Sequence, residues 1–171
     1  MRKKVNQRLG VLRRIKYFIP FYARKLFVNT MILSFLDYYD IVWGDRNSKL
    51  LMDSLQVLQN RATKIVLDRP VYSSTTEALL DLKWKELRVR LRIHRLIYVF
   101  KCLNGLLDHN YNLTTNASVH NYQTRHANDL RINRSRCGKG QLLSSCFLWN
   151  EIPLDIRSSK SVGIFYVITI E

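Results

Sequence analysis

The chain has 171 residues, of which 47% are hydrophobic, a content that argues against wholesale disorder and for a packed core. Its 28 Lys and Arg residues against 13 Asp and Glu residues give a formal net charge of +15. Such a charge predicts a polyanionic partner, with nucleic acid favoured over an anionic membrane surface.

Secretion and membrane insertion are not indicated. The basic N-terminus lacks the apolar run and cleavage site of a signal peptide. The longest apolar region, 26–36, is too short and too polar to span a membrane. Cys102, Cys137 and Cys146 show no CxxC spacing, so neither a disulfide framework nor a zinc ribbon is expected. We therefore expect an intracellular protein without a membrane partner, in either nucleus or cytoplasm.

A first helix is predicted over 3–18, because apolar residues recur there at helical spacing. These residues are Val5, Leu9, Leu12 and Ile15. A first cationic group falls largely off that stripe and consists of Arg13, Arg14 and Lys16.

The next segment, 20–43, is apolar on nearly every face, which is typical of a buried helix. Pro20 suits its first turn and Gly44 its end. We therefore expect this helix to be the centre of a bundle.

A third helix is predicted from a cap at Asn47 or Ser48 to near Asp68, since Pro70 disfavours helix at the residue before it. Its apolar stripe is Leu51, Leu55, Leu58, Ala62, Ile65 and Val66. The remaining surface is predicted to carry Gln56, Gln59, Asn60 and a second cationic group, Arg61 and Lys64.

Two further helices are predicted before residue 106. Ser74 and Glu77 form a capping-box pattern that opens a short helix to about Leu82. The segment 86–103 shows both a helical stripe and strand-like alternation, and its length favours a helix ended by Asn104 and Gly105. The predicted apolar stripe is Val89, Ile93, Leu96, Ile97, Phe100 and Leu103. A third cationic group lines another face: Arg88, Arg92 and Arg95.

The remainder of the chain predicts a long loop and short helices. Asn, Thr, Ser, His and Gly dominate 106–140, with a short extended piece expected at 130–132. A short helix is expected over 141–149, and Pro153 marks its exit. The predicted fold is mainly α: a bundle of about four helices over 1–105, a basic polar loop over 106–140 and a short helical extension over 141–171.

Five phrases occur along this sequence in a particular order. They are LGVLRRI at 9–15, LDYYDIVWG at 36–44, LQVLQNRA at 55–62, HNYQTR at 120–125 and LWNEIP at 148–153. Together they resemble the region downstream of the polymerase palm in non-LTR, jockey-like retrotransposon reverse transcriptases. The resemblance covers about residues 5–165 and implies a helical thumb, which in such polymerases grips the template–primer behind the active site.

The resemblance implies a non-catalytic fragment that holds nucleic acid, a duplex or an RNA/DNA hybrid, with weak sequence preference. The three cationic groups would contact phosphates, which position a duplex without reading its sequence. Each group could equally be a solvated helix face. Tyr122 and Arg125 could clamp an unpaired strand, or could latch their loop to the domain. We expect no enzymatic activity, cofactor or small-molecule substrate, and no oligomeric state is indicated.

The sequence departs from an active polymerase in two places. Two-metal catalysis needs adjacent aspartates on a hairpin, whereas Asp37 and Asp40 are three residues apart in an apolar helical context. They are therefore interpreted as cap or polar-rim residues. After 161–165 a basic amphipathic stretch would be expected, but the chain reads YVITIE. A frameshift, a splice junction or decay of an element copy would each explain that end.

Other functional classes are weaker alternatives. The late residues His120, His126, Cys137 and Cys146 match no metal-knuckle spacing, so no metal site is predicted. The chain could be an inactive remnant of a decayed mobile element. It could also be a stand-alone helix-turn-helix DNA-binding protein, which would need a recognition helix that discriminates bases.

Overall fold

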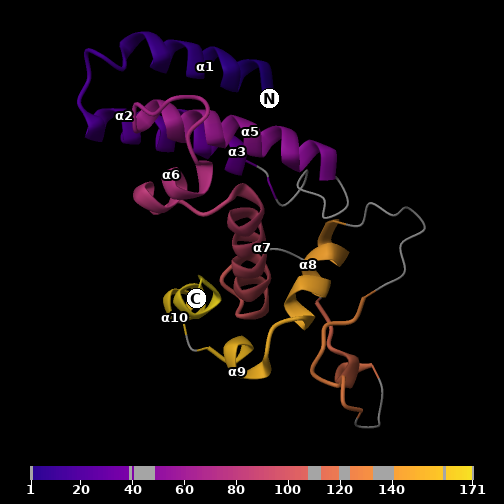
Figure 1. The fold of residues 1–171 in the computed structure, drawn as a ribbon. Coiled ribbons are helices and arrows are strands. Elements are labelled where there is room, and N and C mark those ends of the chain that lie inside the picture. Colours follow the sequence, from indigo (N-terminus) through magenta and orange to yellow (C-terminus); the bar gives the residue numbers. More distant parts are fainter. Residues whose placement is uncertain are drawn as a thin grey trace. The chain divides into compact units, whose positions relative to one another are not determined.

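The computed structural model of the chain is mainly helical, so the predicted fold class is confirmed (Figure 1). The structure describes residues 2–38, 40, 49–107, 113–119, 124–132, 141–159 and 161–170, without the side chains of 141–144 and 167–170. Within these ranges, the extended piece expected at 130–132 is present as one antiparallel bridge between Thr115 and Leu130.

The described residues form two compact units, and the boundary between them falls inside one helix, α7 (Leu87–Leu103). The described residues up to Leu91 belong to unit 1, and those from Arg92 onward belong to unit 2. The sequence instead grouped 1–105 together and separated 106–140 from 141–171. The difference arises because the second half of α7 buries its apolar side chains in the core of unit 2.

Unit 1 is built on α5, which contacts α1, α2 and α6. Its elements are α1 (Arg2–Ile15), α2 (Phe21–Val28), the π-helical turn η1 (Asn29–Leu33), α3 (Ser34–Asp37), α5 (Lys49–Val66), α6 (Thr75–Leu82) and the start of α7. Val5, Leu9 and Leu12 of the predicted α1 stripe are buried, whereas its fourth member, Ile15, is only half-buried. The capping box that opens α6 is also confirmed, because the Ser74 hydroxyl accepts a hydrogen bond from the Glu77 backbone N–H at 3.4 Å.

The helix predicted over 20–43 is helical in its described part, but it is not buried all round. Four residues on one face are buried: Val28, Ile32, Leu33 and Leu36. Phe21, Leu26 and Met31 remain about half exposed, because α1 and α5 cover only one face of this segment. The Thr30 and Ser34 hydroxyls each bond the carbonyl four residues earlier, a contact that bends helices, beside the π-helical turn. Trp43 and Gly44 lie outside the described residues.

α5 holds the start of α7 through two glutamines of the phrase at 55–62. Gln59, predicted on the polar surface, is instead fully buried, and its Nε2 donates to the Lys85 carbonyl at 2.8 Å. The Gln56 Oε1 accepts a hydrogen bond from the Leu87 N–H at 2.8 Å. Since the first N–H groups of a helix have no partner within it, Gln56 satisfies one that α7 would leave open.

Unit 2 is centred on three stacked aromatic rings. Its elements are the rest of α7, η2 (Asn116–Ser118), α8 (Gln141–Asn150), α9 (Leu154–Arg157) and α10 (Val162–Ile170). The Phe100 and Phe165 ring centroids lie 4.8 Å apart, and those of Trp149 and Phe165 lie 5.5 Å apart. All three residues are buried, together with Leu96 and Leu130. Trp149 of the LWNEIP phrase is therefore part of the core of this unit.

Candidate nucleic-acid interface

A basic groove lies in unit 1 where the last turns of α1 and α5 meet the segment that follows α5. The cavity has a volume of about 620 Å³. Its basic lining residues are Arg13, Lys16, Arg61, Lys64 and Arg69. Tyr17, Ile65, Pro70 and Val71 complete the lining. The groove thus unites most of the first two cationic groups, which the sequence could not place side by side.

Local helix chemistry explains part of this arrangement. Arg13 lies in the last turn of α1 and Lys64 in the last turn of α5. A helix carries a partial negative charge at its C-terminal end, so cations there stabilise the helix itself. Helix stability alone accounts for these two positions, but it does not account for Arg69, which follows α5.

The segment after α5 is fixed by a helix-terminating turn. Asp68 adopts the left-handed conformation with φ +55°, and the Arg69 N–H donates to the Lys64 carbonyl at 2.9 Å. The Asp68 N–H bonds the Ile65 carbonyl at 3.3 Å, which completes a Schellman motif. This turn directs Arg69 and Val71 into the lining of the groove.

Two of the five groove cations are paired with carboxylates. The Lys16 Nζ lies 2.5 Å from Asp68 Oδ1, and Arg69 lies 2.5 Å from Asp81. The hydrogen bond to Asp68 raises the pKa of Lys16, and the same bond lowers the pKa of Asp68. Lys16 therefore carries its full charge at neutral pH.

The other three groove cations keep uncompensated charge. The Lys64 Nζ donates to the Val71 carbonyl at 2.6 Å, which is a neutral acceptor. Arg13 and Arg61 are exposed and make no ion pair with another described residue. Because no carboxylate lines the groove among the described residues, its net field attracts anions.

The third predicted cationic group, on α7, does not form one free stripe. Arg88 pairs with Asp53 at 2.8 Å, and Arg92 pairs with Glu151 at 3.3 Å. Arg95 is only 6% exposed, so the prediction that it faces a ligand at the surface is wrong. Leu91 and Val99, one turn to either side of Arg95, are buried as well, because this face of the helix is a packed one.

The remaining predicted contact residues lie apart from the groove. Arg14 is exposed beside Arg13 but does not line the cavity. Arg125 is exposed in a turn of unit 2, and Tyr122 lies outside the described residues. The predicted clamp of Tyr122 and Arg125 therefore stays a prediction.

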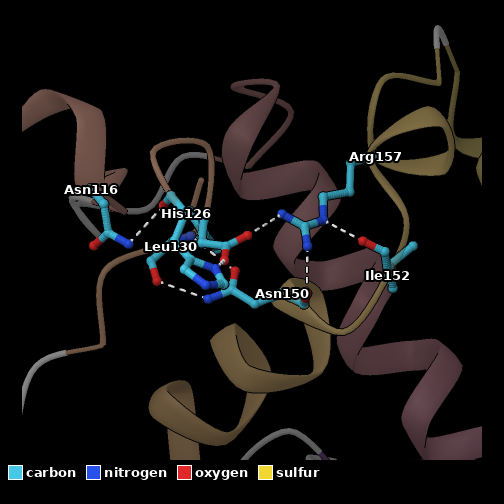
Figure 2. Close-up of polar contacts among 7 residues, drawn as sticks. Asn116, His126, Leu130, Asn150, Ile152 and Arg157 are labelled. Atoms are coloured by element: carbon cyan, nitrogen blue, oxygen red, sulfur yellow. Dashed lines mark hydrogen bonds and ion pairs between the residues drawn. The ribbon is translucent and has the colours of Figure 1, made fainter. Parts of the chain in front are cut away.

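The turn that carries Arg125 is held by a polar clip, shown in Figure 2. The Asn150 side chain makes two hydrogen bonds to the Leu130 backbone, at 2.9 and 3.0 Å. Arg157 donates to the Asn150 and Ile152 carbonyls at 2.5 and 2.7 Å and to Asp129 at 2.8 Å. The clip connects the LWNEIP phrase to the polar loop. Because its polar groups already have hydrogen-bond partners within the protein, we interpret the clip as stabilising the fold rather than as a binding site.

The clip gives unit 2 a pH-dependent stability. Partial burial raises the pKa of Asp129, but hydrogen bonds from Arg157 and His126 outweigh it and hold that pKa below its usual value. Asp129 makes its full contribution to the stability of the folded state at pH values above its unfolded-state pKa of about 4. That contribution is lost as the pH falls through the lower pKa of the folded state. We therefore expect the wild-type protein to have a higher melting temperature than Asp129→Asn at neutral pH. The difference between the two melting temperatures should shrink below about pH 4. Thermal melts in a pH series measure this, and a difference independent of pH would contradict it.

The polymerase-like aspartate phrase is engaged in a structural contact. Both Asp37 carboxylate oxygens accept hydrogen bonds from Arg90, at 2.8 and 2.5 Å, and Asp40 is buried. Among the described residues there is no group of three or more His, Cys, Asp or Glu able to hold a metal ion. His120 and Cys137 lie outside the described residues. No described helix has both the length and the apolar character needed to cross a bilayer.

Sequence reasoning missed Tyr17 and Arg69 as groove residues. Tyr17 follows Lys16 directly, and an aromatic residue beside a basic one is a recognisable signal in a basic chain. Arg69 carried no local signal, because its position depends on the left-handed turn at Asp68. Comparisons with protein-family profiles, curated proteins and solved structures found no match to this chain.

Proposed function

We propose that unit 1 binds nucleic acid through its phosphate backbone, without catalysis, and that the basic groove is the contact surface. The observation that carries the proposal is the convergence of five basic side chains on one cavity, three of them without a compensating carboxylate among the described residues. Backbone contacts of this kind hold a strand or duplex with weak sequence preference.

The resemblance to the post-palm region of non-LTR reverse transcriptases supports the same proposal. It makes an RNA/DNA hybrid the first ligand to test, since a thumb grips the template–primer. The proposed parentage rests on the five phrases alone. An in-frame palm with its aspartate pair in the genomic sequence upstream of Met1 would support it, and an unrelated upstream reading frame would contradict it.

Neutralising Arg13 and Arg61 together is expected to weaken binding and flatten its salt dependence. With three to five phosphate contacts, wild-type affinity should fall roughly 40- to 500-fold between about 50 and 200 mM salt. In Arg13→Gln/Arg61→Gln the slope of log affinity against log salt should be shallower by about 2. Filter binding with an RNA/DNA hybrid measures both quantities.

A matched control removes two charges from the opposite ends of the same helices. Lys3 of α1 and Lys49 of α5 are exposed and do not line the groove, so Lys3→Gln/Lys49→Gln should keep the wild-type slope to within about half a unit. Circular dichroism confirms that each variant is folded. Wild-type binding that does not depend on salt would contradict the proposed function. Equal slopes for the two double variants would instead show that the groove is not the contact surface.

A further inference from the structure

Two aromatic side chains are exposed to solvent on the turn between α1 and α2, and one of them, Tyr17, lines the basic groove. Tyr17 is 76% exposed and Phe18 is 85% exposed. The turn is ordered by backbone hydrogen bonds from Lys16 to Leu12 and from Phe18 to Ile15, both at 2.9 Å. Two largely exposed aromatic residues that are adjacent in sequence bury little apolar surface on this turn, and exposed apolar patches commonly mark interaction sites.

The Tyr17 ring is held in place by a lysine that also lines the groove. Tyr17 lines the cavity, and the Lys16 Nζ lies 4.5 Å from the centroid of its ring. Lys16 is in turn held by Asp68, so the cation is fixed over one face of the ring. Because the side chain is still largely exposed, the opposite face is open for stacking.

An aromatic ring beside groove cations favours single-stranded over double-stranded nucleic acid. In a duplex the bases are paired and stacked inward, so a ring beside the phosphates has no base to stack on. An unpaired strand offers phosphates to cations and a base face to an aromatic ring at the same time. A positively charged groove with an exposed aromatic ring in its lining therefore matches a single strand better than a duplex.

We propose that the groove takes an unpaired nucleic-acid strand, whose phosphates contact Arg13 and Arg61 while one base stacks on Tyr17. This inference rests on the proposed function and narrows its ligand. The Tyr17 ring supplies affinity that depends on the bases, whereas the cations supply affinity that depends only on the phosphates.

Fluorescence anisotropy at one salt concentration tests the inference with three probes of equal length, about 12 nucleotides. They are an oligothymidylate, a strand of abasic sites with the same phosphates, and a mixed-sequence duplex. Wild type should bind the oligothymidylate about tenfold more tightly than the abasic strand, and also more tightly than the duplex. Tyr17→Ser should lose most of the preference over the abasic strand while its affinity for that strand is unchanged, and Tyr17→Phe should keep the preference.

Tyr38→Ser is the matched control. Tyr38 is 66% exposed at the far end of the α2–η1–α3 segment, roughly 25 Å from the turn by the rise of a helix, and it does not line the groove. This variant should bind all three probes as wild type does. Equal binding of abasic and base-bearing strands, tighter binding of the duplex, or an unchanged preference in Tyr17→Ser would each overturn the inference and leave the proposed function standing. Absence of salt-dependent binding to every probe would overturn both.

Discussion

Replacing Phe100 with alanine is expected to lower the free energy of unfolding of the unit 2 core by about 3–5 kcal/mol. Phe100 is 1% exposed, and its ring stacks on Phe165 at 4.8 Å and lies 6.4 Å from Trp149. Alanine would remove the transfer energy of the ring, leave a cavity and delete the ring contacts. Urea unfolding followed by Trp149 fluorescence, with Trp43 and Trp84 replaced by phenylalanine, measures the change.

The same substitution at Phe147 provides the control. Phe147 precedes Leu148 on α8 but is 49% exposed, so Phe147→Ala should cost less than about 1.5 kcal/mol. Phe100→Leu keeps most of the buried volume and should cost far less than the alanine variant. Equal costs for Phe100→Ala and Phe147→Ala would show that the three-ring stack is not the centre of this core.

The second large effect is expected at Gln59, whose amide is fully buried in unit 1. Gln59→Met keeps the approximate volume but leaves the Lys85 carbonyl without its donor, so the free energy of unfolding should fall by about 1–3 kcal/mol. Gln59→Glu should be worse, because a buried carboxylate cannot donate to that carbonyl and should cost more than about 3 kcal/mol at neutral pH.

The glutamate variant also carries a pH signature. Burial raises the pKa of a carboxyl group, so Gln59→Glu is most stable below the unfolded value of about 4.3 and loses stability as the pH rises through its folded pKa. Gln7 is exposed on α1, and Gln7→Glu should show no such loss. Chemical unfolding of both variants at acidic and neutral pH decides the matter. A Gln59→Glu variant as stable as Gln7→Glu at neutral pH would contradict the buried position of Gln59.

Much of the helical order was predictable from local chemistry. The stripe of Val5, Leu9 and Leu12 predicted α1, although the helix ends at Ile15, three residues before its predicted end. The Ser74 cap predicted the start of α6. Pro70 placed the end of α5 near Asp68, within two residues of its observed end at Val66. These signals act over one or two helical turns, so a single sequence is sufficient to read them.

Tertiary burial was not predictable in the same way. Gln59 looks like a surface residue by its polarity. Its burial is tolerable because its Nε2 donates to the carbonyl of Lys85, distant in sequence, and its Oε1 accepts a hydrogen bond from Gln56 at 3.1 Å. Arg95 shares a helix with the exposed Arg88 and Arg92, and its burial depends on what packs against each turn of α7. The groove was likewise hidden, because it combines two helix ends with a turn that requires the left-handed Asp68.

The continuity of α7 has a practical consequence for dissecting this protein into fragments. A chain cut after Leu91 would keep only five residues of α7, which are too few to hold a helical turn firmly against fraying. A chain cut after Gly105 would instead expose Leu96, Val99 and Phe100, because the residues that bury them would be missing. Such an exposed apolar patch favours aggregation. Each of these two cuts is therefore expected to destabilise one of the units. Expression of either unit is therefore best attempted with the full length of the chain.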